Sequence, residues 1–360
     1  MNSKTLGAVA ATVLSAIVAG ISVAADTPQP AIMSGKAASS LLLDVARAGD
    51  RLVAVGERGH IVLSDDAGKT WRQVASPVRS MLTTVYFVSP QQGWIVGHDS
   101  VVLATADAGE SWQVQHYREF SGEEPAPIED QGIDEGAMLD EAEYEDDESA
   151  GRDIGSRDGV PLLDVWFADA QVGVAIGAYG LMLRTTDGGK SWTDVSSRIS
   201  NRDGWHFNAI GGIPGNRDLV LIAGEKGTLY RSVDGGATFS TLRSPYDGSF
   251  FGITGSTDGA LYVYGLQGRL FRSINRGDSW SRLETGVTSG LNDGCELGNG
   301  SLMVAGNAGI VLVRVPGDDK VVANRRSDRK SVMSCVAGGG AAVLVGEGGA
   351  RQAAANGLTP

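Results

Sequence analysis

Two aspartates, Asp44 and Asp164, are the acidic residues in this sequence whose placement could support hydrolysis of a glycosidic bond. Each stands just before the central apolar residue of a strand that is repeated along the chain. A glycosidase needs two carboxyl groups facing one bond, roughly 5–10 Å apart. The two aspartates are two repeats apart, and we expect them to line a central channel. We favour ordinary polar lining, with a glycan-active or glycan-binding channel mouth as the alternative.

The other nucleophiles and metal ligands form no recognisable catalytic set. The four histidines, His60, His98, His116 and His206, fall in no serine- or cysteine-based motif. No spacing of His and Cys is typical of zinc, and no stretch follows the pattern of a calcium loop. We therefore expect a protein that is not an enzyme, with no catalytic residue, no metal site and no cofactor.

The elements that position these residues come from an internal repeat. A turn of the form Gly-x-x-Gly-x-apolar recurs at an interval near 41 residues, or about twice that where an acidic segment intervenes. Its first residues are Gly56, Gly97, Gly177, Gly224, Gly265, Gly306 and Gly346, and the second copy has Ser100 where the second glycine should stand. Glycine-rich turns separate short strands, and a period near 40 is typical of propeller blades. The sequence predicts an all-β, seven-bladed propeller with four antiparallel strands in each blade.

A second motif predicts the outer hairpin in five of these blades. It reads Ser/Thr-x-Asp/Asn-x-Gly-x-Ser/Thr-aromatic, which resembles the Asp-box, or bacterial neuraminidase repeat. A short side-chain carboxylate or amide accepts hydrogen bonds from its own turn, and the aromatic ring is buried between neighbouring sheets. We expect a structural role for the paired residues of each box: Asp66 and Trp71, Asp107 and Trp112, Asp187 and Trp192, Asp234 and Phe239, and Asn275 and Trp280.

Sialidases share Asp-boxes and are the enzymatic alternative. That family needs three arginines around the substrate carboxylate and a tyrosine nucleophile paired with an acid. Its Arg-Ile-Pro element near the first blade is absent here, where Ile213-Pro214 follows Gly212 in the fourth blade. The motifs therefore favour structural use of the boxes.

The repeat also predicts how the chain ends and the cysteines are placed. Little sequence follows Arg351 that could form a fourth strand, so we expect an N-terminal strand near residues 27–33 to close the last blade. Cys295 and Cys335 are assigned to the same inner-strand position of adjacent blades. Equivalent side chains point in the same rotational sense, so we expect two buried, reduced cysteines. A disulfide, common in exported proteins, is the alternative.

The negative charge belongs to one segment. Residues 118–158 contain 16 Asp and Glu and 3 Arg, which equals the formal net charge of −13 of the whole chain. The rest is close to neutral, and a broad nucleic-acid-binding surface is excluded. We expect residues 118–158 to be a disordered insertion between blades two and three. A tether for a basic partner, or a loose divalent-cation site, is the functional alternative.

The N-terminus has the pattern of an export signal. Lys4 precedes an apolar stretch from Leu6 to Val23, and small residues follow near Ala24. We expect a cleaved signal peptide at residues 1–24 and a propeller domain at residues 25–360. The mature protein would be periplasmic or secreted, monomeric and not membrane-spanning. The alternative is that the apolar stretch is kept as a membrane anchor.

The face that carries the Gly-x-x-Gly turns, which we call the turn face, is where partner contacts are expected. The two residues inside each turn vary from blade to blade and face outward, so they are better recognition candidates than the box aspartates. The candidates from the turns are Arg58, His98, Tyr179, Lys226, Gln267 and Asn307, and Trp205 and Phe250 join them where inner strands begin.

The blades resemble one family of Asp-box propellers. Val85-Tyr-Phe87 and Val165-Trp-Phe167 near the inner strands are followed by Gly-Trp-Ile-Val-Gly97 or Gly-Val-Ala-Ile-Gly177, and then by Thr-x-Asp-x-Gly-x-Ser-Trp. These motifs are similar to those of the photosystem II stability/assembly factor family. The resemblance implies a seven-bladed, non-enzymatic assembly factor that contacts a membrane-protein client through basic residues. We therefore expect an exported scaffold that binds a protein partner, most simply a membrane-associated complex.

Overall fold

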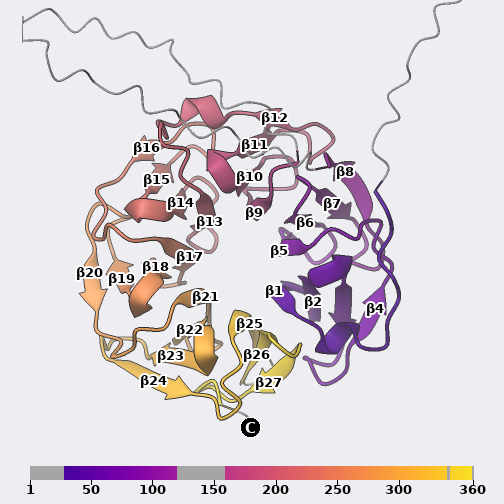
Figure 1. Cartoon of the computed structure of the whole chain (residues 1–360). Helices are drawn as coiled ribbons and strands as arrows, with labels where there is room; N and C mark the ends of the chain where they lie inside the picture. Colours follow the sequence, from indigo (N-terminus) through magenta and orange to yellow (C-terminus); the bar gives the residue numbers. More distant parts are fainter. Residues whose placement is uncertain (1–27, 120–158, 339–340, 359–360) are drawn as a thin grey trace, which may run out of the picture.

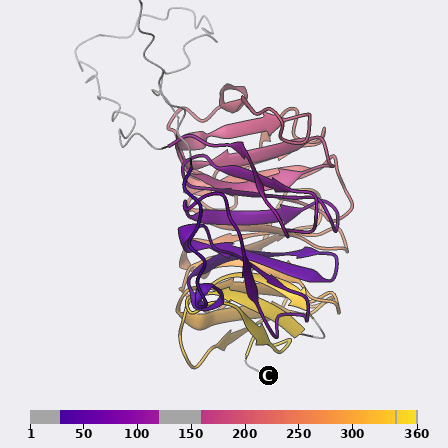
Figure 2. The same ribbon diagram turned by 90° about the vertical axis from the view of Figure 1, so that its right-hand side faces the viewer.

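The protein forms a closed ring of seven sheets. This computed structural model describes residues 28–119, 159–338 and 341–358, so the predicted signal peptide and nearly all of the acidic insertion lie outside the described residues. Figure 1 shows the ring along its axis, with the innermost strand of each blade nearest the centre. Figure 2 shows it from the edge, with the strands running across its thickness. The predicted all-β, seven-bladed propeller is confirmed.

The first four blades each contain four antiparallel strands. Blade one has β1 (Leu42–Ala48), β2 (Arg51–Gly56), β3 (Ile61–Ser64) and β4 (Arg72–Val74). Blade two has β5 (Leu82–Phe87), β6 (Gly93–Gly97), β7 (Val102–Thr105) and β8 (Gln113–His116). Blade three has β9 (Leu162–Phe167), β10 (Gly173–Gly177), β11 (Met182–Thr185) and β12 (Thr193–Asp194). Blade four has β13 (Phe207–Gly212), β14 (Val220–Gly224), β15 (Leu229–Ser232) and β16 (Ser240–Thr241).

The last three blades continue the pattern until the seventh. Blade five has β17 (Phe250–Gly255), β18 (Leu261–Gly265), β19 (Leu270–Ser273) and β20 (Ser281–Leu283). Blade six has β21 (Leu291–Glu296), β22 (Leu302–Gly306), β23 (Ile310–Arg314) and β24 (Val321–Arg325). Blade seven has β25 (Val332–Gly338), β26 (Ala341–Gly346) and β27 (Arg351–Ala353). Short 3-10 turns are η1 (Ala37–Ser39), η2 (Glu57–Gly59), η3 (Ala178–Gly180), η4 (Ser196–Arg198), η5 (Glu225–Gly227), η6 (Leu266–Gly268) and η7 (Asn307–Gly309).

The second strand of each blade lies in the core between neighbouring blades. β6, β10, β14, β18 and β22 are buried along their whole length, because adjacent sheets cover both of their faces. This explains why these segments are continuous apolar runs rather than alternating ones. Each of them ends in glycine, as β2 does at Gly56. A Cβ atom at Gly56 would stand 2.2 Å from the carbonyl oxygen of Leu41, so the inner strand approaches too closely for any side chain.

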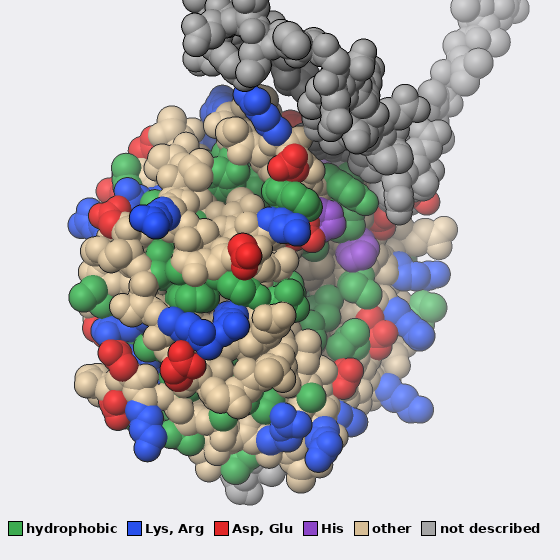
Figure 3. All heavy atoms as spheres, turned by 60° about the vertical axis from the view of Figure 1, so that its left-hand side comes forward, with side chains coloured by type: hydrophobic (Ala, Val, Ile, Leu, Met, Phe, Trp, Pro, Cys, Tyr) green, Lys and Arg blue, Asp and Glu red, His purple; other side chains and the backbone are tan. Residues whose placement is uncertain are grey.

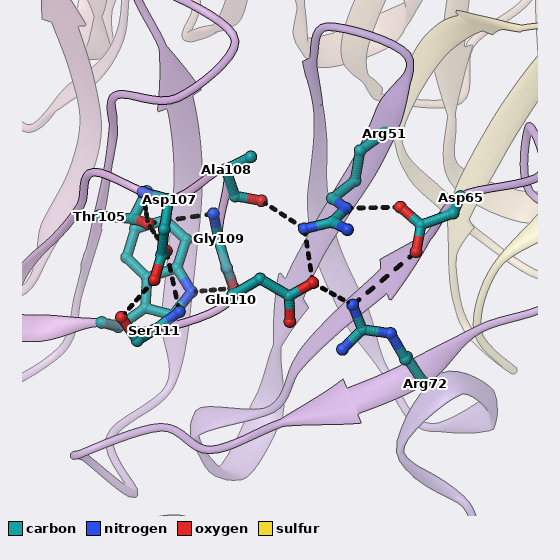
Figure 4. Close-up of polar contacts among 10 residues, drawn as sticks. Arg51, Asp65, Arg72, Thr105, Asp107, Ala108, Gly109, Glu110 and Ser111 are labelled. Atoms are coloured by element: carbon teal, nitrogen blue, oxygen red, sulfur yellow. Dashed lines mark hydrogen bonds and ion pairs between the residues drawn. The ribbon is translucent and has the colours of Figure 1, made fainter.

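Charged side chains add contacts at the outer edge of the ring, between blades one and two. The guanidinium group of Arg51 donates to Asp65 at 2.5 Å and to the carbonyl oxygen of Ala108 at 3.2 Å. Glu110, in the Asp-box turn of blade two, accepts from Arg51 at 2.8 Å and from Arg72 at 2.5 Å. Figure 4 shows this network beside the box. The outer turn of one blade is thereby joined to the strands of the preceding one.

The predicted closure of blade seven by an N-terminal strand is corrected. Its sheet has three strands among the described residues, and the N-terminal segment lies on blade one instead. Ala31 donates its N–H to the carbonyl oxygen of Ser76 at 3.1 Å, and Ser34 donates to the side chain of Gln73 at 2.6 Å. Two prolines, at positions 28 and 30, lack the N–H donors that a paired strand requires. The ring is therefore closed by contacts between blades seven and one.

The prediction of two reduced cysteines is wrong. Cys295 and Cys335 form a disulfide between β21 and β25, with Cα atoms 5.8 Å apart. The error is one residue of register. Cys335 pairs with Leu344 and corresponds to Gly294, which pairs with Val304, so Cys295 is one position further along its strand. A shift of one residue turns a side chain to the opposite face of a sheet, and the two sulfur atoms therefore face each other.

Candidate functional site

The variable residues of the turn face are held by one repeated backbone geometry. The second variable residue of five turns has a φ between 51° and 57°: Arg58, Tyr179, Lys226, Gln267 and Ala308. Non-glycine residues are uncommon in this left-handed region. Its recurrence with five different side chains indicates that the turn imposes the conformation. These side chains therefore stand at corresponding points of successive blades on a rigid support.

Seven of the eight predicted contact residues reach the surface of the turn face. Arg58, Lys226, Gln267 and Asn307 are exposed, while His98, Tyr179 and Trp205 are half-buried. Phe250 is the exception and is fully buried. It is the first residue of β17, as Leu42 is of β1 and Phe207 of β13, and its ring packs against Tyr246 and Phe271. Phe250 is therefore a core residue and is removed from the candidate surface.

Three of these side chains form an aromatic cluster with the neighbouring His206, across blades three and four. The ring of Tyr179 meets the ring of His206 edge-on, with centroids 4.9 Å apart. The ammonium group of Lys226 lies 5.7 Å from the ring centroid of Trp205, within range of a cation–π interaction. Asn201 fixes Trp205 by donating to its carbonyl oxygen at 2.8 Å and accepting from its N–H at 3.0 Å. We call Tyr179, Trp205, His206 and Lys226 the aromatic cluster.

A second cation–aromatic pair continues this arrangement onto blade five, and sequence reasoning missed it. The guanidinium carbon of Arg269 lies 5.8 Å from the ring centroid of Tyr246. Arg269 directly follows the turn η6, and Tyr246 lies in the segment that leads to β17. The signal in the sequence is an aromatic residue placed a few positions before an inner strand, as Trp205 is before β13. The turn face thus pairs a cation with an aromatic ring on two adjacent blades.

Basic residues also gather where blade six leads into blade seven, in a segment that the sequence analysis did not single out. A pocket there is lined by Arg326, Lys330 and Arg351 together with Glu347 and residues 344–346 of β26. Asp328 accepts hydrogen bonds from Arg326 and Arg351, which holds the two guanidinium groups together. In the space-filling view of Figure 3, Lys and Arg side chains are interspersed with Asp and Glu rather than gathered into one patch.

The predicted channel residues Asp44 and Asp164 join blade one to blade two and blade three to blade four. Asp44 accepts N–H groups from Val45 of its own strand and Val85 of blade two, both at 2.8 Å. Asp164 accepts from Val165 at 2.7 Å and from Ile210 of blade four at 2.8 Å. Burial raises the pKa of Asp44 and raises the pKa of Asp164 well above its ordinary value. Their oxygens are occupied in holding the ring together.

A third aspartate, Asp293 on β21, occupies the same position as Asp44 and was missed. It pairs with Ala305 as Asp44 pairs with Val55. The predicted placement of Cys295 at the apolar position of its inner strand would put Gly294, the residue before it, in this place. The same one-residue register error that misplaced Cys295 hid this carboxyl group. Burial, and then the charge of Asp44, raise the pKa of Asp293 to about 7. Counting forward from the buried residue that begins each inner strand, Leu291 here, would have found it.

The box aspartates are engaged within their own turns. In the first box, Asp66 accepts hydrogen bonds from the N–H groups of Lys69 and Thr70 at 3.0 and 2.9 Å and from the hydroxyl of Thr70 at 2.7 Å. These bonds lower the pKa of Asp66 to about 2. Trp71 donates its indole N–H to the carbonyl oxygen of Gly68 at 3.2 Å. The bond from the backbone N–H four residues on recurs at Asp107, Asp187, Asp234 and Asn275. The indole bond recurs at Trp112, whereas the indole N–H groups of Trp192 and Trp280 have no partner among the described residues.

Within the described ranges, no three His, Cys, Asp or Glu side chains are arranged to hold a metal ion. The part of the chain that the structure describes also has no helix long and apolar enough to cross a membrane.

Comparison with known proteins gives a consistent relationship. The family model described as "Photosynthesis system II assembly factor YCF48" matches residues 63–126 and 154–283. The photosystem II assembly lipoprotein Ycf48 of Synechococcus sp. (strain CC9902) is 26% identical over 159 residues, which are 43% of this chain and 47% of that protein. The chloroplastic photosystem II stability/assembly factor HCF136 of Cyanidioschyzon merolae is 37% identical over 59 residues, 16% of this chain and 14% of that protein. The chain thus matches about half the length of its Ycf48 relative and less of HCF136.

Solved structures support the fold. A structure described as "YCF48 bound to D1 peptide" superposes with a TM-score of 0.61 at 15% identity, covering 92% of this chain and 96% of that one. The WD40 β-propeller domain of Doa1 gives a TM-score of 0.60 at 14% identity over 89% and 93% of the two chains. Because unrelated propellers score alike, these similarities show the architecture and leave the binding site to be argued from the residues.

Proposed function

This chain belongs to the photosynthesis system II assembly factor YCF48 family, and on that basis we propose that it is a non-catalytic scaffold that binds a segment of a membrane-associated protein complex and assists its assembly. The observation that carries the proposal is the aromatic cluster of the turn face. A family member's structure is described as bound to a D1 peptide, which supports a peptide segment as the kind of ligand.

The chemistry of the aromatic cluster suits an extended chain. Half-buried Tyr179 and Trp205 offer rigid apolar contact area at small cost in side-chain entropy, and such residues are enriched among binding hot spots. Lys226 and Arg269 each stand over a ring, where they can meet a carboxylate while their stems stay packed. We infer that the ligand is a peptide segment with both apolar and acidic side chains.

Affinity capture from the native envelope tests the proposal. Full-length protein should retain one reproducible membrane-complex component, both with and without residues 118–158. Trp205→Ala combined with Lys226→Glu should lower the affinity at least thirtyfold, since truncating a hot-spot residue costs about 2 kcal/mol or more. Lys69→Glu is the matched control, because Lys69 is an exposed lysine in an Asp-box turn on the opposite face. Absence of a reproducible partner in either form, or equal loss in the control, would overturn the proposal.

Enzymatic action on glycans is the competing function. The bonds that Asp44 and Asp164 make to neighbouring blades favour a structural use of both carboxyl groups. Assays on sialyl and glucan substrates test this directly. Turnover that disappears in Asp44→Asn or Asp164→Asn, in protein that keeps its fold, would replace the scaffold proposal with a glycosidase.

We further propose export to the periplasm or beyond. The charged start, apolar stretch and small residues of segment 1–24 support this, as does the description of one relative as a lipoprotein. Cell fractionation, with mass spectrometry of the mature N-terminus, tests it. Protein that stays in the cytoplasmic fraction would contradict export, and an intact N-terminus in the membrane fraction would indicate an anchor.

A further inference from the structure

The hydroxyl group of Ser334 lies between two carboxyl groups at the axis of the ring. Its oxygen is 2.7 Å from Oδ1 of Asp44 on blade one and 2.7 Å from Oδ2 of Asp293 on blade six. Ser334 itself belongs to blade seven and is 2% exposed. The contact therefore joins the three blades on either side of the point where the ring closes.

The hydrogen count of this arrangement requires an additional proton. A serine hydroxyl carries one hydrogen and can donate it to only one of the two carboxyl groups. The other oxygen at 2.7 Å must then donate to Ser334, which only a protonated carboxylic acid can do. Two ionised carboxylates would leave one oxygen facing the hydroxyl oxygen with no hydrogen between them. Ser334 is 2% exposed, so this contact is shielded from solvent even though both carboxyl groups are only half-buried.

We propose that Asp44 and Asp293 share one proton through Ser334, and that loss of this proton loosens the closure of the ring between blades seven and one. The disulfide Cys295–Cys335 holds blades six and seven together. Repulsion between the two carboxylates is therefore relieved on the side of blade one. No covalent bond crosses that side in the described residues, where Arg47 donating to the carbonyl oxygen of Ala337 is one of the few polar ties.

The charged and titratable side chains around Asp44 and Asp293 do not neutralise a second negative charge on this pair. The titratable and charged side chains on the strands of this pair and on those packed against them are Arg47, Arg51, Tyr86, Tyr262, Tyr264 and Glu296. Asp164 interacts with both carboxyl groups through its charge. Arg47, Tyr86 and Glu296 bond elsewhere, to Ala337, Phe167 and Thr257, Arg51 pairs with Asp65, and Tyr262 accepts from Arg314. Tyr264 lies 3.4 Å from Asp293 and meets the hydroxyl of Thr254 at 2.7 Å.

Asp164 adds to the negative potential, since the charges of Asp44 and Asp293 both raise its pKa. Burial is the largest influence on all three carboxyl groups and disfavours their charged forms. The pKa of Asp293, raised to about 7, places the loss of the shared proton near neutral pH.

The sign of the pH effect follows from the raised pKa. A carboxyl group whose pKa is higher in the closed ring than in the opened one favours closure at low pH, and this preference is lost as the pH rises toward the higher pKa. Opening then releases one proton, so its equilibrium constant rises about tenfold per pH unit. Between pH 5 and pH 7 the expected change is roughly a hundredfold, with a plateau above that.

Infrared titration of the unmodified full-length protein tests the shared proton directly. A carboxylic-acid carbonyl band that is absent from Asp293→Asn should be present in wild-type protein at pH 6 and be lost near pH 7 to 8. A band that is the same in both proteins belongs to Asp164, whose pKa is also raised, and without an Asp293-dependent band the proposal fails. Wild-type protein with every carboxyl group ionised at pH 6 would overturn the proposal, whether or not any variant folds.

Hydrogen exchange of β1 and β25 across pH 5 to 8, corrected for intrinsic rates, tests the coupling to closure. The hundredfold rise in opening should appear in wild-type protein and vanish in Asp293→Asn, whose amide can donate to Ser334 at every pH. Asp66→Asn is the control, because that box aspartate is ionised throughout the range and the slope should be unchanged. A slope shared by wild type and Asp293→Asn would refute the coupling.

Discussion

Removing the disulfide between blades six and seven should destabilise the ring by a predictable amount. The double variant Cys295→Ala/Cys335→Ala opens a covalent loop that spans 40 residues of sequence. In the chain-entropy description, closing a loop of that length removes about 13 cal/mol/K from the unfolded state, or about 4 kcal/mol at 25 °C. The alanines leave the interface between the two blades otherwise intact, so most of the loss should come from this entropy.

Urea unfolding, followed by tryptophan fluorescence, measures the free-energy difference. The oxidised wild type should exceed the double variant by about 3–4 kcal/mol. Wild-type protein reduced after unfolding and then refolded under reducing conditions should match the double variant, which separates the effect of the loop from the loss of two sulfur atoms. Thiol titration of the unfolded, unreduced protein should find no free thiols. A difference below 1 kcal/mol, or two free thiols, would refute this reasoning.

Three further predictions concern packing and acid stability. Trp112→Ala should cost about 3–5 kcal/mol, the usual range for a buried aromatic residue, and more than Trp192→Ala, whose ring is half-buried; urea unfolding compares the two. Gly56→Ala should greatly reduce the yield of folded protein, because its Cβ would meet a backbone carbonyl at 2.2 Å, while Gly298→Ala should be tolerated, with nothing within 4 Å. Stability from Asp66, whose pKa is lowered to about 2, is full above pH 4 and is lost as the pH falls through 2, so Asp66→Asn should flatten the decline of the melting temperature in that window.

Each of these has a result that would contradict it. Equal losses at the two tryptophans would mean that burial between blades does not set the contribution of the box aromatic residue. Normal folding of the Gly56 variant would show that the inner strand can move away from the turn. Identical acid profiles for the wild type and the Asp66 variant would show that the box carboxylate does not contribute through its charge.

The architecture was predictable because its signals are local. A glycine turn recurs in each blade and an Asp-box in five of them, and each motif indicates a hairpin that its own residues stabilise, as Asp66 and Thr70 illustrate. The buried second strand is visible in the same way, as an apolar run that ends in glycine. Counting such signals is enough to give seven blades and the order of their strands.

The residues at the ring axis and the placement of the chain ends were harder to predict from the sequence, because they depend on strand register and on contacts between distant segments. The hairpin between the first two strands of a blade varies in length, so counting back from the glycine of blade six placed Cys295 and Gly294 one residue out of step. That single step concealed both the disulfide and Asp293. The position of residues 28–36 on blade one was equally unpredictable, since no local sequence pattern in that stretch indicates which blade it contacts.

The disulfide also changes what a break in the backbone would do. Each residue of the turn between β23 and β24, residues 315–320, is exposed, and the turn contains Lys320, a site for trypsin. This turn lies inside the loop that Cys295 and Cys335 close. A single cut there leaves two fragments that still migrate together without reductant and separate once the bond is reduced. The last blade would thus stay attached to a nicked molecule, which confers on this edge of the ring a tolerance to proteolysis that its exposed loops alone would not provide.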